Sequence, residues 1–88
     1  MLTDTDLLTL KRAAERDITK TLKKKEELGV RLERVKKKIA KGNPDATTGE
    51  ILGMVEKTKA CMDYEKCSRK LGRLTVAVMH IDAELMRR

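Results

Sequence analysis

The apolar positions of this chain repeat with the period of an α-helix over two long stretches. In the first stretch, ten positions at alternating steps of four and three residues form a seam, and seven of them are apolar: Leu7, Lys11, Ala14, Ile18, Thr21, Lys25, Leu28, Leu32, Val35 and Ile39. Such spacing is typical of a left-handed coiled coil. The middle of this seam is weak, because Leu22 is the one apolar residue between Thr19 and Glu27.

The second stretch carries two apolar stripes on opposite sides of one predicted helix. Stripe A consists of Ala60, Tyr64, Cys67, Leu71, Leu74, Val78, Ile81 and Leu85. Stripe B consists of Ile51, Val55, Thr58, Met62, Val76, Met79, Ala83 and Met86. Two helices packed together can cover only one stripe, so the other must meet another chain or contact water.

One break separates the two stretches. Gly42 is expected to end the first helix in the left-handed conformation, and Pro44 prevents its continuation. Thr47 with Glu50 has the spacing of a capping box, which opens the second helix.

These signals predict a single all-α domain. We expect a first helix over about residues 4–41, a loop over about 42–47 and a second helix over about 48–87. A short loop between long helices predicts an antiparallel two-helix coiled-coil hairpin.

Two registers of this hairpin compete. The first pairs Val35 with Val55 and leaves stripe A free. In the other register, the predicted helix over 48–87 is rotated so that stripe A covers the seam. This register pairs Ile18 with Leu74 but places Val35 against Lys57. The first register is favoured near the loop, and beyond the weak middle both stay open.

With stripe A free, we expect the chain to form a homodimer. Two antiparallel copies would pair Leu71 with Leu74 around a twofold axis between Gly72 and Arg73, which gives a four-helix bundle. A different protein on stripe A, or a monomer that tolerates the exposed stripe, are the alternatives.

Charge is unevenly distributed along the chain. The net charge is +7, and residues 1–41 hold 13 basic and 7 acidic side chains, a local net charge of +6. An excess of this kind favours an acidic protein, a nucleic acid or an anionic membrane surface as a partner. A second basic cluster on the later helix consists of Lys66, Arg69, Lys70 and Arg73.

Six basic residues form a basic ridge on the outer face of the first helix: Arg12, Arg16, Lys23, Arg34, Lys37 and Lys41. The ridge could follow a phosphate backbone, or it could be a solvated face interrupted by acids such as Glu15 and Glu33. Nucleic acid is the less favoured partner, because Tyr64 is the single aromatic residue available for base stacking.

Candidate chemistry is sparse. Cys61 and Cys67 lie on different faces of one helix and cannot form a disulfide with each other, and His80 is the single histidine. We therefore predict no catalytic residues, no metal site and no cofactor. No apolar run reaches the about 20 residues of a membrane span and no secretory signal is visible, so we expect no membrane association and a cytoplasmic location.

These features together predict a non-enzymatic, basic coiled-coil protein of the protein-binding type. We expect a small regulator or inhibitor that self-associates through its second helix and occupies or bridges a protein partner, an acidic one by charge. The alternatives are a nucleic-acid-binding regulator that uses the basic ridge and a structural subunit of a larger helical assembly.

Overall fold

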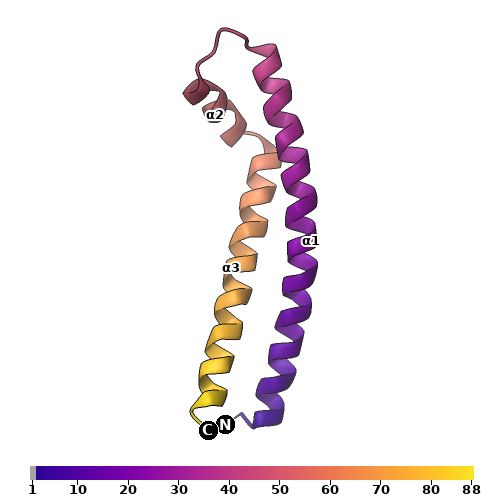
Figure 1. Cartoon of the computed structure of the whole chain (residues 1–88), viewed down its shortest axis with the longest axis vertical. Coiled ribbons are helices and arrows are strands. Elements are labelled where there is room, and N and C mark those ends of the chain that lie inside the picture. Colours follow the sequence, from indigo (N-terminus) through magenta and orange to yellow (C-terminus); the bar gives the residue numbers. More distant parts are fainter. Residues whose placement is uncertain (1) are drawn as a thin grey trace.

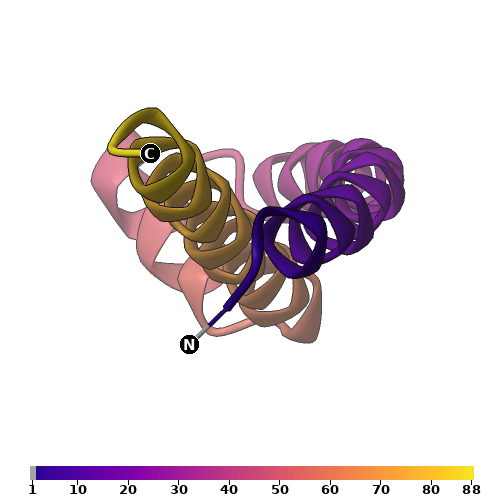
Figure 2. The ribbon, with the colours of Figure 1, turned by 90° about the horizontal axis from the view of Figure 1, so that it is seen from below.

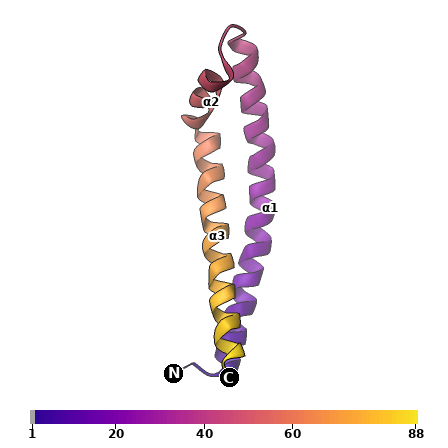
Figure 3. The ribbon, with the colours of Figure 1, turned by 60° about the vertical axis from the view of Figure 1, so that its left-hand side comes forward.

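Three helices and no strand make up the part of the chain that the structure, a computed structural model, describes, which is residues 2–88. They are α1 (Asp4–Gly42), α2 (Thr48–Glu56) and α3 (Lys59–Met86). α1 and α3 lie side by side and run in opposite directions, and the two termini meet at the end far from the loop (Figures 1 and 3). The molecule is extended, with dimensions of 61 × 19 × 15 Å. The all-helical prediction is confirmed.

Local hydrogen bonds explain where α1 begins and ends. Thr3 and Asp6 form a reciprocal capping box, in which each side chain accepts the backbone N–H of the other at 3.1 Å. At the other end, the side-chain amide of Asn43 donates to the Ile39 carbonyl at 2.9 Å. The left-handed conformation expected at Gly42 was wrong, since no glycine in the described residues has a positive φ. Asn43 satisfies a terminal carbonyl instead.

The second predicted helix is in fact two helices, so a continuous helix over 48–87 was wrong. α2 ends at Glu56, and Thr58 adopts an extended conformation before α3 begins. The Thr58 hydroxyl donates to the Val55 carbonyl at 2.7 Å and accepts the Cys61 backbone N–H at 3.3 Å. One side chain therefore closes α2 and caps α3.

The break has a packing consequence, because Val55 and Ala60 are five residues apart. In a continuous helix they would point about 140° away from each other. In the structure both are 3% exposed and belong to one buried cluster with Leu32 of α1 and Cys61. The interruption at Thr58 thus lets residues from two different helix faces cover the same partner.

Beyond the break, stripe A lies on the covered side of α3. Ala60 and Cys67 are buried and the other six members are partly buried, while Met62, Val76, Met79, Ala83 and Met86 of stripe B are exposed. All ten positions of the α1 seam are buried or partly buried. Within the chain, α1 covers stripe A, and the expected contact of stripe A with a second chain stays a prediction. Stripe B packs inward only near the loop, through Ile51 and Val55. Figure 2 shows that α2 and α3 lie on one side of α1.

Ion pairs across the helices fix their register. Lys11 Nζ lies 2.7 Å from Asp82 Oδ1, and Arg88 Nη1 lies 2.9 Å from Asp4 Oδ1. In the weak middle, the Cys67 thiol donates to the Thr21 carbonyl at 3.4 Å. Beyond the break, these contacts correspond to the second register, in which stripe A covers the seam. Near the loop, Val35 packs against the buried cluster that contains Val55, as the first register predicts.

The Lys11–Asp82 contact is also linked to pH. The hydrogen bond and the negative charge of Asp82 raise the pKa of Lys11 above its ordinary value of 10.5. Because the pKa of Lys11 is raised on folding, the stabilisation that the contact supplies is lost as the pH rises through the raised pKa.

Two aspartate substitutions on α3 distinguish its covered and outer faces. Leu71→Asp places a carboxylate of stripe A against the α1 seam and should lower the free energy of unfolding by at least about 2 kcal/mol. Val76→Asp lies on the outer face and should change it by no more than about 0.5 kcal/mol. Urea unfolding followed by circular dichroism measures both. Equal losses for the two variants, or a larger loss for Val76→Asp, would contradict the orientation of α3.

Candidate interaction surfaces

The first candidate surface is the outer part of stripe B, which we define as Met62, Val76, Met79, Ala83 and Met86. Met79 is 65% exposed and Met86 is 87% exposed. Glu65 and Arg69 separate Met62 from the other members, so the continuous apolar surface is the C-terminal half of α3. Methionine side chains are flexible and polarizable, and they adapt to differently shaped partners.

The flank of this surface is basic. Arg73, His80 and Arg87 recur every seven residues next to the outer part of stripe B, and Arg87 Nη1 also lies 3.5 Å from Glu84 Oε2. On the other flank, Asp82 is engaged by Lys11 of α1. Apolar side chains bordered by basic ones suit a partner whose apolar face is bordered by acidic residues.

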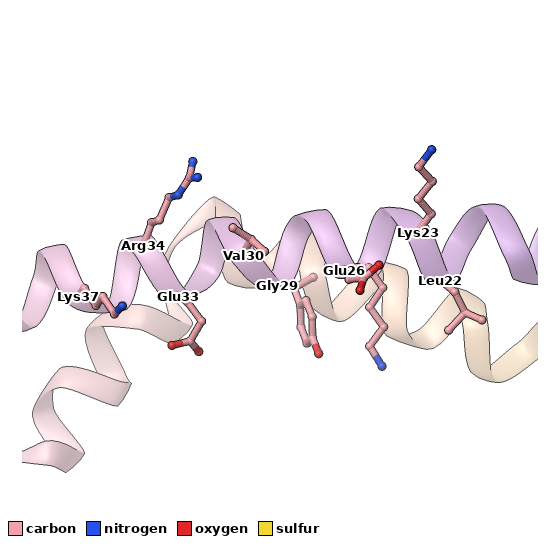
Figure 4. Close-up of a pocket in the computed structure, with 10 residues that line it drawn as sticks. Leu22, Lys23, Glu26, Gly29, Val30, Glu33, Arg34 and Lys37 are labelled. Atoms are coloured by element: carbon pink, nitrogen blue, oxygen red, sulfur yellow. The ribbon is translucent and has the colours of Figure 1, made fainter.

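The second candidate surface is an open groove of about 970 Å³ beside the break, lined mainly by α1. Its apolar part comprises Leu22, Gly29, Val30 and Tyr64, and Val30 is 53% exposed. Figure 4 shows Lys23 and Arg34 pointing away from α3, while Leu22 and Glu33 lie on the side toward it. The groove was not predicted from the sequence, because its shape depends on how α3 meets α1 near Tyr64.

Tyr64 itself packs within the chain. A Cβ atom added to Gly29 would lie 3.5 Å from Tyr64 Cε2, an ordinary van der Waals distance. Lys25 Nζ lies 5.7 Å from the centre of the Tyr64 ring, within the range of a cation–π interaction. The one aromatic residue is thus held against α1 at the wall of the groove.

The basic ridge is fully exposed. All six of its residues are exposed, and within residues 2–88 none of them forms an ion pair. Two acids that interrupt the ridge in sequence pair with other lysines: Glu15 with Lys11 at 4.0 Å and Glu33 with Lys36 at 3.3 Å. The ridge charges are therefore available to an anionic partner.

The cysteines are placed as small core residues. Cys61 and Cys67 are both free thiols and both buried. Burial, together with the nearby Glu65 carboxylate, raises the pKa of the Cys61 thiol above its ordinary value of 9.0. A thiol held in its protonated form is a poor nucleophile, so the environment of Cys61 does not favour catalysis.

Other reactive groups are dispersed. His80 is exposed on α3. Among residues 2–88, no three His, Cys, Asp or Glu side chains are grouped closely enough to hold a metal ion. None of the helices in this range is both long and apolar enough to cross a membrane.

Comparison of the chain with known protein families, curated proteins and solved structures finds no match. The structure places stripe A on the side of α3 that faces α1, keeps the basic ridge dispersed along the outside of α1, and exposes the outer part of stripe B.

Proposed function

We propose that this chain is a non-enzymatic, protein-binding helical module that acts by occupying or bridging a protein partner. The observation that supports it is the outer part of stripe B, which stays exposed on α3 while stripe A is covered by α1. Burial of one such side chain contributes about 1.5–3 kcal/mol. A partner that covers Val76, Met79 and Met86 would bury the apolar side chains that α1 leaves exposed.

The basic residues that flank the outer part of stripe B indicate which kind of partner would bind there. An amphipathic helix can lie along α3 with its apolar residues against Val76 and Met79. Acidic residues beside its apolar face would then meet Arg73, His80 and Arg87. We therefore propose an acidic helical segment as the partner.

A second copy of the chain fits this surface less well. In an antiparallel pair of α3 helices centred on His80, Arg73 of one copy would approach Arg87 of the other. Like charges opposed across an interface are destabilising. Homodimerisation is thus the secondary form of this proposal.

Two designed peptides test the proposal. They share one leucine-rich amphipathic pattern, and their flanking residues are glutamate in one and lysine in the other. We expect the glutamate peptide to bind at least about tenfold more tightly, a difference of about 1.4 kcal/mol. Met79→Asp should abolish the binding, as measured by fluorescence anisotropy.

Met54→Asp is the matched control, because Met54 is an exposed methionine on α2, outside the outer part of stripe B. It should leave the affinity for the glutamate peptide unchanged. Light scattering on the free chain identifies a second copy as the occupant if it gives a dimer that Met79→Asp dissociates. A monomer that binds neither peptide would refute the proposal.

A second candidate function is binding to a nucleic-acid backbone through the basic ridge. The specific observation in its favour is that the six ridge residues are exposed and make no ion pairs within residues 2–88. Such binding would depend on phosphate contacts and fall steeply with salt.

Charge reversal tests this second function. Arg16→Glu with Lys23→Glu should lower the affinity for duplex RNA or DNA at low salt by at least about tenfold and reduce the salt dependence. The control combines Lys57→Glu with Arg87→Glu, which changes the net charge equally outside the ridge and outside the second basic cluster. Equal losses in both double variants would show that only net charge matters, and no binding by the unaltered chain would exclude the function.

A further inference from the structure

Lysines from both long helices surround a pocket of about 390 Å³ on one flank of the α1–α3 pair. α1 contributes Thr21, Lys24 and Leu28, and α3 contributes Lys59, Asp63, Lys66, Cys67 and Lys70. Four of these eight side chains are cationic and one is anionic. The pocket shares no residue with the outer part of stripe B or with the basic ridge.

The flanking positions of paired helices usually carry opposite charges that attract each other. One pair on this flank follows that pattern, since Arg31 Nη1 lies 3.5 Å from Asp63 Oδ2. One heptad further along the pair, Lys24 takes the position equivalent to Arg31, and Lys70 takes the position equivalent to Asp63. Two lysines therefore occupy the place where an ion pair is expected.

Within the described chain, no acid compensates these lysines. Arg31 engages Asp63, the one carboxylate of the pocket, and Lys24, Lys59, Lys66 and Lys70 form no ion pair in residues 2–88. Lys66 and Lys70 also lie four residues apart on one helix face, where like charges repel. An anion between the two helices would convert these repulsions into attractions.

The inner wall of the pocket is fixed by the fold. Thr21 and Cys67 are both buried, and the Cys67 thiol donates to the Thr21 carbonyl at 3.4 Å. This contact holds the backbones that carry Lys24 and Lys70 next to each other. The cationic groups are thus brought together by packing and not by a flexible loop.

We propose that this pocket binds an oligophosphate, an anion with two or more linked phosphate groups. Lys24, Lys66 and Lys70 would donate to its oxygens, and Lys59 would contact it from the end nearest the break. Lysine ammonium groups bind phosphate as compact point charges with three donors each. Cations spread over two helices match an extended, multiply charged anion better than a single carboxylate.

The test uses inorganic tripolyphosphate as the probe, with orthophosphate as the comparison, in isothermal titration calorimetry at low salt. We expect tripolyphosphate to bind with 1:1 stoichiometry and at least about tenfold more tightly than orthophosphate, equivalent to about 1.4 kcal/mol. The triple variant Lys24→Gln, Lys66→Gln, Lys70→Gln should lose this binding. The control Lys20→Gln, Lys38→Gln, Lys57→Gln removes the same charge elsewhere and should retain it.

Thermal unfolding without the anion shows whether the triple pocket variant still folds. Because the substitutions remove repulsion, this variant should melt at a temperature no lower than that of the unaltered chain. Tripolyphosphate should raise the melting temperature of the unaltered chain and of the control only. Equal weakening of tripolyphosphate binding in both triple variants, or no binding at all, would overturn the proposal.

A short single-stranded RNA, which carries the same phosphate chemistry, distinguishes a free oligophosphate from a nucleic-acid backbone. Competition between this RNA and tripolyphosphate for the unaltered chain, lost in the pocket variant, would support the site with a backbone as its source. RNA binding that survives in the pocket variant belongs to the basic ridge. The outcome does not depend on the peptide experiment, since the two surfaces have no residue in common.

Discussion

The structure depends on one constraint: a single seam on α1 has to be covered by apolar residues that lie on two different faces of the later half of the chain. Near the loop these residues are Ile51 and Val55, and further along they are the members of stripe A. An uninterrupted helix cannot present both sets to α1. Thr58 resolves the conflict, because its hydroxyl ends α2 and caps α3, which then lies in a new orientation.

The same break determines which surfaces remain for other molecules. Once stripe A is covered, the exposed apolar residues of α3 are those of the outer part of stripe B, and their flank carries Arg73, His80 and Arg87. The register that follows also aligns Arg31 with Asp63 and, one heptad away, Lys24 with Lys70. The protein-binding proposal and the oligophosphate proposal therefore both derive from how α3 is turned relative to α1.

Much of α1 could be predicted from the sequence, because its signals are local. All ten positions of the predicted seam are buried or partly buried, and the Thr3–Asp6 pair marked the start of the helix. The break was missed because residues 57–59 contain neither glycine nor proline. The five-residue step from Val55 to Ala60, with Thr58 three residues before Cys61, was the available signal.

The roles of the two stripes could not be settled without that break. With one continuous helix, the good match of Val55 to the seam favoured stripe B against α1 near the loop and left both stripes open as the covered one beyond the weak middle. The pocket lysines were likewise hidden, since a shift in register of a few residues changes which side chains face Lys24. The basic ridge was simpler to predict, because exposure on the outer face of α1 depends on helical period alone.

The most direct measurement of the turned α3 is the relaxation of methyl signals by a soluble paramagnetic gadolinium chelate in NMR. We predict strong relaxation of the Met62, Met79 and Met86 methyl groups and weak relaxation of those of Val55, Ala60 and Leu71. Protection of Val55 together with Ala60 is the specific signature of the break at Thr58. The account would be contradicted if the methyl groups of Ala60 and Leu71 relaxed as strongly as that of Met79 while the methyl group of Met62 was protected.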